Sequence, residues 1–181
     1  MSLDICPAWL SFILENGIRS KFHNPAIMLR EYIKPGNTVV DIGCGPGYFS
    51  IPMAAMAGRK GKVISVDIQK KMLQKLIKNA ERHHVEEIIQ TINCTSDDLC
   101  VNEKADFILT FWMVHEVGDV KNFIRQIYNI MKPGSYYLLS EPKIHVSKKK
   151  YTEILRMAES AGLKKHKEVT IWGSRSTLFT V

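Results

Sequence analysis

The segment that most constrains this chain is VVDIGCGPGYFS, residues 39–50, in which a strand, a glycine-rich turn and a helix follow one another directly. Thr38–Ile42 is apolar and β-branched, which predicts a strand covered on both faces. The turn contains three glycines at alternate positions, Gly43, Gly45 and Gly47. Glycines let the backbone turn sharply and let a ligand approach closely. The helix expected over Tyr48–Ala57 would direct its free N–H groups and its positive dipole end at such a ligand.

The spacing of the glycines indicates which ligand the turn holds. A dinucleotide fingerprint is G-x-G-x-x-G and places a pyrophosphate on the helix N-terminus. Here the third glycine comes one residue early, and Asp41 lies two residues before the first, which suits a cofactor with a cationic end. The second strand, expected over Lys62–Ile68, carries Asp67, about twenty residues beyond the glycines, where a carboxylate accepts both ribose hydroxyls. A nicotinamide-dependent oxidoreductase is the alternative from another enzyme class, and the spacing disfavours it.

Four segments together resemble a known family: DIGCGPG, the acid-tipped SVDI, ADFILTFWMVHEV and MKPGSYYLLSEP. They are similar to the class I S-adenosylmethionine-dependent methyltransferases, in particular the small-molecule, ubiquinone/menaquinone methyltransferase-like branch. The resemblance runs from about residue 24 to the C-terminus, in the family's order. It implies a Rossmann-like α/β sandwich whose seven-stranded sheet is mostly parallel, with one antiparallel strand near the C-terminus. It also implies S-adenosylmethionine at the carboxyl edge of the strands and methyl transfer from a sulfonium.

The resemblance also assigns cofactor contacts to particular residues. By the family's pattern these are Asp41, Gly43, Cys44, Gly45, Gly47, Asp67, Ile68, Thr95, Ser96, Asp97 and Phe111. Asp41 and the glycine turn would hold the methionine part and Asp67 the ribose, with the residues after the third strand beside the adenine. The chain departs from the pattern at Thr95, where the family often has an acid. Ser96 would then offer its backbone N–H to the ring, and Asp97 would reach the amine.

The end of the fourth strand faces both cofactor and acceptor in this family. Residues 110–113, TFWM, lack the Asn-Pro-Pro-Tyr/Phe motif with which related enzymes grip exocyclic or amide nitrogens. Phe111 and Trp112 offer apolar surface instead, either to the core or to the site. With further aromatic residues near the start of the chain, this favours a small apolar or aromatic acceptor.

Two residues are candidates for catalysis. His115 stands where small-molecule members often carry the first residue of a His-His pair, and an imidazole can take a proton from a phenol or hydroxyl at neutral pH. Its alternative role is a hydrogen bond that fixes the loop. Glu141, followed by Pro142, would orient an acceptor amine or hydroxyl, or form a structural salt bridge. The sequence contains no Ser-His-Asp order and no dense cluster of metal ligands, so no metal is expected.

Length and composition favour one domain. With 181 residues, of which 45% are hydrophobic, the chain is expected to form a single methyltransferase domain over 1–181. Residues 1–24 would be an N-terminal helical extension, with a helix over Ala8–Gly17 that either covers the substrate pocket as a lid or packs on the sheet's flank. The apolar spacing predicts helices over 25–33, 69–83, 120–131 and 148–161, and strands over 87–94, 105–114, 136–141, 164–171 and 176–181.

Charge and cysteine content bear on partners and on location. The net charge is +7, which raises RNA as a partner, but Lys148–Lys150 and the lysines of 164–167 are expected at opposite edges of the sheet. An RNA methyltransferase and a non-catalytic cofactor-binding or RNA-binding module therefore stay as alternatives beside solvated lysine faces. Four cysteines without a C-x-x-C pair suit reduced thiols in a cytoplasmic protein. The start, MSLDICPAW, does not resemble a secretory signal, and no apolar run approaches the roughly twenty residues of a membrane span.

Overall fold

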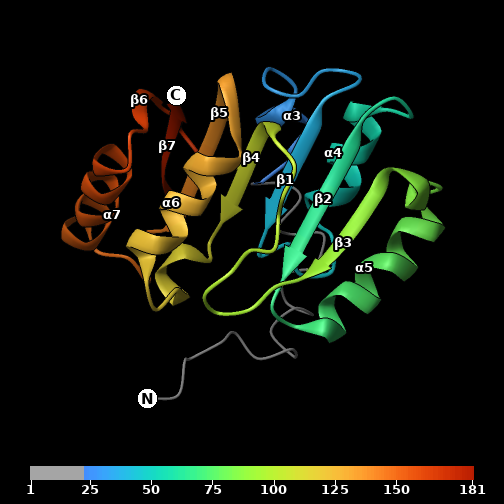
Figure 1. The fold of residues 1–181 in the computed structure, drawn as a ribbon, viewed down its shortest axis with the longest axis horizontal. Coiled ribbons are helices and arrows are strands. Elements are labelled where there is room, and N and C mark those ends of the chain that lie inside the picture. The colour runs from blue at the N-terminus through green and yellow to red at the C-terminus, as the bar shows by residue number, and fades with distance from the viewer. Residues whose placement is uncertain (1–22) are drawn as a thin grey trace.

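The computed structural model describes residues 23–181, and within them one sheet of seven strands runs through the protein in the order β3-β2-β1-β4-β5-β7-β6. The strands are β1 Thr38–Ile42, β2 Lys62–Asp67, β3 Ile89–Asn93, β4 Ala105–Phe111, β5 Met131–Pro142, β6 Lys164–Glu168 and β7 Ser174–Thr180. Figure 1 shows them side by side, with β3 and β6 at the two ends. β7 runs antiparallel to both of its neighbours, and the other pairings are parallel. The expected mostly parallel sheet with one reversed strand is confirmed.

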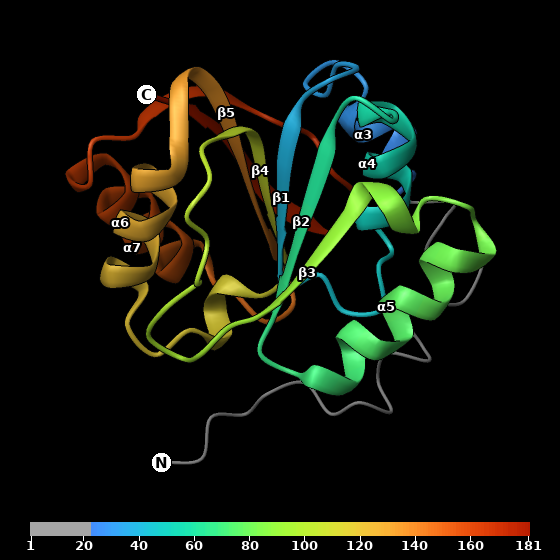
Figure 2. The same cartoon turned by 45° about the vertical axis from the view of Figure 1, so that its right-hand side comes forward.

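Helices cover both faces of the sheet. They are α3 Pro25–Leu29, α4 Ser50–Ala57, α5 Lys70–Arg82, α6 Val120–Ile130 and α7 Lys148–Ser160, with 3₁₀ turns η1 Glu86–Ile88 and η2 Val114–Glu116. Figure 2 shows α6 and α7 on one face, and α3, α4 and α5 on the other. The carboxyl ends of the parallel strands therefore meet at one edge between the two helical layers, which is where ligands bind in such sheets.

The central strands are buried on both faces, as their composition predicts. In β1, Val39 packs on the side of α3 and α4, whereas Val40 and Ile42 pack on the side of α6 and α7. In β4, Phe107 and Ile108 divide between the same two layers, and neither has exposed surface. Period-two alternation therefore assigns each successive side chain to one of two hydrophobic cores.

The end of α3 and the start of α4 differ from the helices expected from the sequence. Asn24 caps α3, because its side-chain oxygen accepts hydrogen bonds from Ala26 N at 3.0 Å and Ile27 N at 3.3 Å. The helix ends at Leu29, earlier than the expected Ile33. α4 begins at Ser50 rather than Tyr48, because the glycine turn continues through Tyr48 and Phe49.

Several strand boundaries expected from the sequence are wrong. β3 begins at Ile89 instead of Glu87, because Glu86–Ile88 form η1; β6 ends at Glu168 instead of Ile171, and β7 begins at Ser174 instead of Ser176.

The largest differences at the centre of the sheet are in β4 and β5. β4 ends at Phe111 instead of Val114, because Trp112 adopts a left-handed backbone with φ of 60° and the following residues form η2. β5 begins at Met131 instead of Tyr136, so the Lys132-Pro133-Gly134 segment lies within the strand. Its pairing with β4 shifts register there, between Ala105 and Phe107, which accommodates the irregular backbone.

The helix expected over Ala8–Gly17, and with it the lid, lies outside the described residues. Among residues 23–181 the longest helices are those of α5 and α7, and none of the helices there has the length and apolar character that crossing a membrane requires.

Candidate functional site

The glycine turn lies at the carboxyl end of β1 and is fixed to β2. Gly43 N and Cys44 N donate hydrogen bonds to Val66 O at 2.8 and 3.1 Å. The three glycines have φ values of 72°, 54° and 98°, a backbone region that residues with a Cβ rarely adopt. A Cβ at Gly45 would meet no atom within 4 Å, so this part of the turn borders open space. A ligand can approach the backbone there.

Asp67 connects the end of β2 to the same turn. Its Oδ2 accepts a hydrogen bond from Gly45 N at 2.8 Å, and its Oδ1 accepts one from Gln69 N at 2.8 Å. The side chain is 7% exposed, and this burial raises the pKa of the carboxyl, although the two backbone N–H groups act to lower it. A carboxylate oxygen has a second lone pair, so both oxygens retain capacity for ligand hydroxyls. The structure thus brings together two residues that the sequence assigns to one cofactor.

Asp41 is placed differently from Asp67. It is 2% exposed, and Ser50 Oγ donates a hydrogen bond to its Oδ2 at 2.5 Å. Ser65 Oγ in turn donates to Ser50 Oγ at 2.9 Å. This chain of hydroxyls lies beneath the glycine turn on the α4 face. The two serines were missed in the sequence, although a polar residue within the apolar strand β2 was an available signal.

Cys44 lies within the turn and is buried. Burial, with the negative charges of Asp41 and Asp67 as further causes, holds the pKa of its thiol well above the ordinary value. The side chain is therefore a neutral thiol at physiological pH, and its contribution to the site is the shape and the backbone of the turn.

The residues after β3 form a tight turn at the same edge. Thr95 Oγ1 accepts a hydrogen bond from Asp98 N at 3.0 Å, and the carbonyl of Asp97 accepts one from Gln126 of α6 at 2.8 Å. Cys94 N donates to Asp67 O at 3.2 Å, which ties this turn to the end of β2. Ile68, Ser96 and Asp97 have exposed side chains. All residues assigned to the ribose and adenine therefore lie along one rim.

Glu141 organises the other side of the edge. It has no exposed surface, and its Oε1 accepts hydrogen bonds from Met113 N at 3.2 Å and Val114 N at 3.0 Å. Its Oε2 accepts bonds from His115 N at 3.1 Å and from His115 Nδ1 at 2.6 Å. The two candidate catalytic residues thus form one unit, in which a buried carboxylate holds η2 and orients the imidazole.

His115 is the partly exposed member of this unit. Its side chain is 17% exposed, and its ring lies parallel to that of His145, with 6.0 Å between centroids and 9° between planes. His145 follows β5 and was missed in the sequence analysis. With Nδ1 directed at Glu141, the hydrogen-bonding pattern of His115 favours the tautomer whose proton is on Nδ1 and whose lone pair is on Nε2.

Aromatic rings line the α4 side of the same edge. Phe111 packs 4.7 Å from Phe49 and 5.1 Å from Trp112, measured between ring centroids. The indole nitrogen of Trp112 donates to Ser174 Oγ at 2.8 Å, which joins β4 to the start of β7. His23, another residue that the sequence analysis missed, packs edge-on against both Phe111 and Trp112. Phe111 therefore belongs to an aromatic cluster between the glycine turn and β7.

Met113 connects the glycine turn with the segment that Glu141 holds. A Cβ at Gly43 would lie 2.8 Å from Met113 Cγ, so this side chain packs directly on the first glycine of the turn. Its backbone N–H is also bound by Glu141. The segment that carries His115 is therefore in contact with the glycine turn. Across residues 23–181, no group of three or more His, Cys, Asp or Glu side chains is arranged to hold a metal ion.

Comparisons with known proteins agree with this geometry. Residues 33–174 match the family described as Methyltransferase domain. A demethylmenaquinone methyltransferase of Symbiobacterium thermophilum is 25% identical over 130 residues, which are 71% of this chain and 51% of that protein. A ribosomal protein L11 methyltransferase of Dictyoglomus turgidum is 30% identical over 139 residues, 76% of this chain and 42% of that protein. The chain thus spans about half the length, or less, of these curated relatives.

A solved structure extends the agreement to the whole fold. The crystal structure of a SAM-dependent methyltransferase from Aquifex aeolicus superposes with a TM-score of 0.86 at 21% identity, covering 98% of this chain and all of that one. Its fold is the same mostly parallel α/β sandwich. With the family match over residues 33–174, these observations establish that the chain belongs to the methyltransferase domain family, as a member of the class I S-adenosylmethionine-dependent methyltransferases.

Proposed function

We propose that residues 1–181 form one methyltransferase domain that binds S-adenosylmethionine at the glycine turn and methylates a small apolar or aromatic acceptor. The observation that carries the proposal is the bond between Gly45 N and Asp67 Oδ2, beside open space at Gly45. This arrangement puts a ribose-binding carboxylate and a turn open to close approach at one point of the edge. A cofactor that joins a ribose to a cationic amino acid fits both.

The described residues suit the parts of this cofactor. Asp67 would accept the ribose hydroxyls, with Ile68 beside them, and the turn of Thr95–Asp97 would flank the adenine. The methionine part would lie over residues 43–47, above the buried carboxylate of Asp41. Phe111 would support the glycine turn from below, through its contact with Phe49, the residue that precedes α4.

Methyl transfer demands alignment of the two reactants and exclusion of water more than acid-base machinery. When bound, the cofactor would supply an electrophilic methyl group on a sulfonium, whose carbon–sulfur bond breaks to leave a neutral thioether as the methyl group passes to the acceptor oxygen. His115 would take the proton of the acceptor hydroxyl at Nε2. Glu141 would hold the Nδ1–H of the same ring and stabilise the positive charge that the ring gains. The buried Glu141 is thus a positioning residue, and His115 is the group that faces the acceptor.

The acceptor side of the edge favours a compact, partly apolar molecule. Trp112 and Met113, which precede His115 in the chain, would supply an aromatic and a thioether surface. Among the relatives, one is named for a quinone precursor and another for a ribosomal protein, so both small and large acceptors occur. The aromatic cluster supports the first kind for this chain.

RNA is the second candidate acceptor. The observation that favours it is the edge strand β6, whose sequence KKHKE is exposed at every position, in a chain of net charge +7. RNA binding through such lysines would weaken steeply as salt is raised. A salt series with labelled RNA, scored for both affinity and incorporated methyl label, separates an RNA methyltransferase from a module that only binds RNA.

Two measurements test the proposal. Calorimetric titration with S-adenosylhomocysteine should give a dissociation constant in the micromolar range, whereas NADH titrated in parallel should not bind. Labelled S-adenosylmethionine is then incubated with a panel of hydroquinones and catechols, a ribosomal protein fraction and ribosomal RNA. Label in the small aromatic compounds alone supports the proposal. Tighter binding of NADH, or label in the protein or RNA alone, would overturn it.

A further inference from the structure

We propose that the acceptor carries an anionic group, which binds in a groove between α7 and β7; this inference rests on the methyl transfer proposed at His115. The groove has a volume of about 350 Å³, within the range of small-molecule sites. Three cationic side chains line it, each from a different element: Lys143 from the turn after β5, Lys148 from α7 and Arg175 from β7. Their convergence suits a carboxylate or a phosphate group.

Arg175 is the fixed member of the three. It is half-buried, and its Nη1 donates a hydrogen bond to Val146 O at 3.1 Å. A guanidinium carries five N–H groups in a planar fork, and this bond uses one of them. Held in this way, the guanidinium is oriented before a ligand arrives, which lowers the entropic cost of binding an anion.

The groove keeps an excess of positive charge. Glu168 is the acidic residue that lines it; its Oε1 bonds to Lys165 Nζ at 2.7 Å, and its charge also interacts with Lys148. Within the described part of the chain, no ion pair involves Lys143, Lys148 or Arg175. Tyr151, which also lines the groove, adds no negative charge, because burial raises the pKa of its hydroxyl to about 12. The groove therefore presents a net positive field to a ligand.

The elements that line the groove also contact the proposed site of methyl transfer. The turn after β5 supplies Lys143 to the groove and stacks His145 on His115. Lys150, in the first turn of α7, donates to His115 O at 3.3 Å. Ser174 lines the groove and accepts the hydrogen bond of Trp112. From these contacts we expect an acceptor whose hydroxyl lies at His115 to extend its anionic group into the groove.

Matched pairs of probes test the charge requirement. Amide signals of the isotope-labelled protein are followed by NMR as 4-hydroxybenzoate or its neutral amide, 4-hydroxybenzamide, is added. Phenyl phosphate and phenol form a second pair, which distinguishes a phosphate from a carboxylate. Each titration is run with and without S-adenosylhomocysteine. We expect at least one anion to bind fivefold or more tightly than its neutral partner, with shifts centred on residues 143–148 and 174–177.

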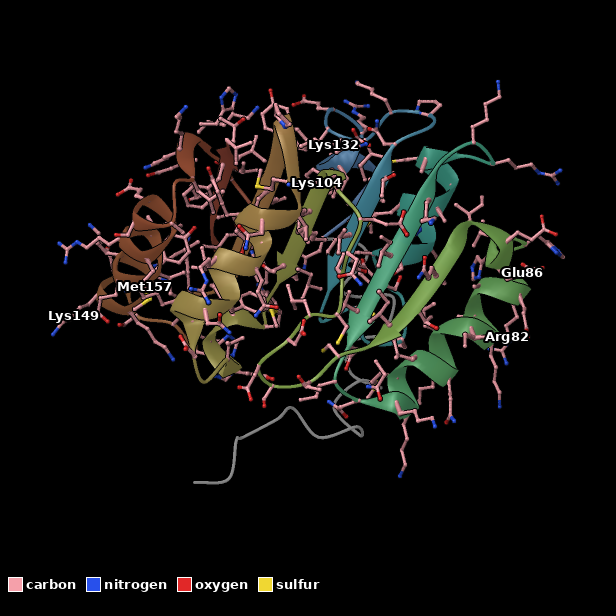
Figure 3. The ribbon with its side chains drawn as sticks, viewed as in Figure 1. Arg82, Glu86, Lys104, Lys132, Lys149 and Met157 are labelled. Atoms are coloured by element: carbon pink, nitrogen blue, oxygen red, sulfur yellow. The ribbon has the colours of Figure 1, made fainter. Side chains whose placement is uncertain are left out.

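Variants locate the binding site. Arg175→Gln and, separately, Lys143→Ala should each remove most of the preference for the anion, and two variants guard against misfolding of either one. Lys149→Ala is the matched control, because Figure 3 shows Lys149 pointing away from α7 into solvent, and its side chain does not line the groove. It should keep the full preference.

Three results would overturn the inference. The first is equal binding of each anion and its neutral partner, and the second is an equal effect of Arg175→Gln and Lys149→Ala on that binding. The third is displacement of the anion by a short RNA that shifts the same amide signals and whose binding depends steeply on salt. Failure of S-adenosylhomocysteine to bind would instead contradict the proposed function. The titrations without it would still report on the groove, so the two failures are distinguishable.

Discussion

The two halves of the sheet's carboxyl edge are held by different kinds of interaction. At β1 and β2, the turn of Gly43–Gly47 is held by backbone N–H groups, and Asp67 meets it through Gly45 N. At β4 and β5, a single buried side chain, Glu141, holds three successive N–H groups and the ring of His115. The first half is a backbone cradle that suits an invariant cofactor. The second depends on side chains, which can change with the acceptor while the fold is kept.

Replacing His115 should affect one half alone and have the largest effect. We expect His115→Ala to lower the rate of methyl transfer by roughly 10²- to 10⁴-fold, the usual cost of losing a general base. Affinity for S-adenosylhomocysteine should stay within about twofold, because the cradle does not use the imidazole. Single-turnover kinetics on an acceptor found in the label screen, with calorimetry, measure both. Unchanged turnover with a lowered melting temperature would assign His115 a structural role.

Replacing Glu141 should show how much of the second half rests on one carboxylate. Glu141→Gln keeps the size of the side chain but removes its charge. The atom that faces His115 Nδ1 becomes either an amide N–H donor or an uncharged, weaker oxygen acceptor. The free energy of unfolding should fall by about 3 kcal/mol, the scale for breaking a buried charged network. Urea denaturation measures it. Glu153→Gln, on an exposed position of α7, is the control and should change stability by less than about 0.5 kcal/mol. Equal effects of the two variants would contradict the role given to Glu141.

Replacing Asp67 should weaken the first half without disturbing the second. Asp67→Asn is expected to cost about 1.5–3 kcal/mol of affinity for S-adenosylhomocysteine, because charge-assisted hydrogen bonds to the ribose are lost. Titration calorimetry tests this, and binding as tight as that of the wild type would contradict the ribose assignment.

The same carboxylate sets the direction of a pH effect. Ribose hydroxyls donate to the ionised form, so binding favours deprotonated Asp67 and lowers its pKa in the complex. Since burial raises the pKa of Asp67 in the free protein, affinity should fall as pH drops through that raised pKa, at a higher pH than for an ordinary aspartate. The affinity of Asp67→Asn, measured over the same range, should lack this dependence.

The smallest expected effect concerns the contact between the two halves, where Met113 packs on Gly43. Two glycine variants isolate the contribution of this contact to stability. Gly43→Ala and Gly45→Ala both place a Cβ at positive φ, at an expected cost of about 1–2 kcal/mol in unfolding free energy. Only the Cβ at Gly43 would meet Met113, so Gly43→Ala should cost about 1 kcal/mol more. Urea denaturation compares the two, and in a Met113→Ala background the difference between the costs of Gly43→Ala and Gly45→Ala should shrink. Equal costs would show that Met113 simply moves aside.

The halves also differ in how well the sequence predicts them. β1, the glycine turn and Asp67 follow from residues close together in the chain, and the structure has them where the pattern puts them. The predicted end of β4 was wrong, because the apolar run continues to Val114, whereas Glu141 binds the N–H groups of residues 113–115 and the chain turns into η2 there. The sequence names both His115 and Glu141, but it does not indicate that one holds the other.

The sequence by itself determined the fold class and the edge that carries the site, because strand, turn and helix periodicities are local and act through the backbone. Only the tertiary structure decided the partners of the polar side chains. His115 and Glu141 are 26 residues apart, Trp112 and Ser174 are 62 apart, and Arg175 reaches Val146 across 29 residues. Such pairs depend on strand order and register, which arise from packing the whole sheet between its two helical layers. No local pattern encodes them.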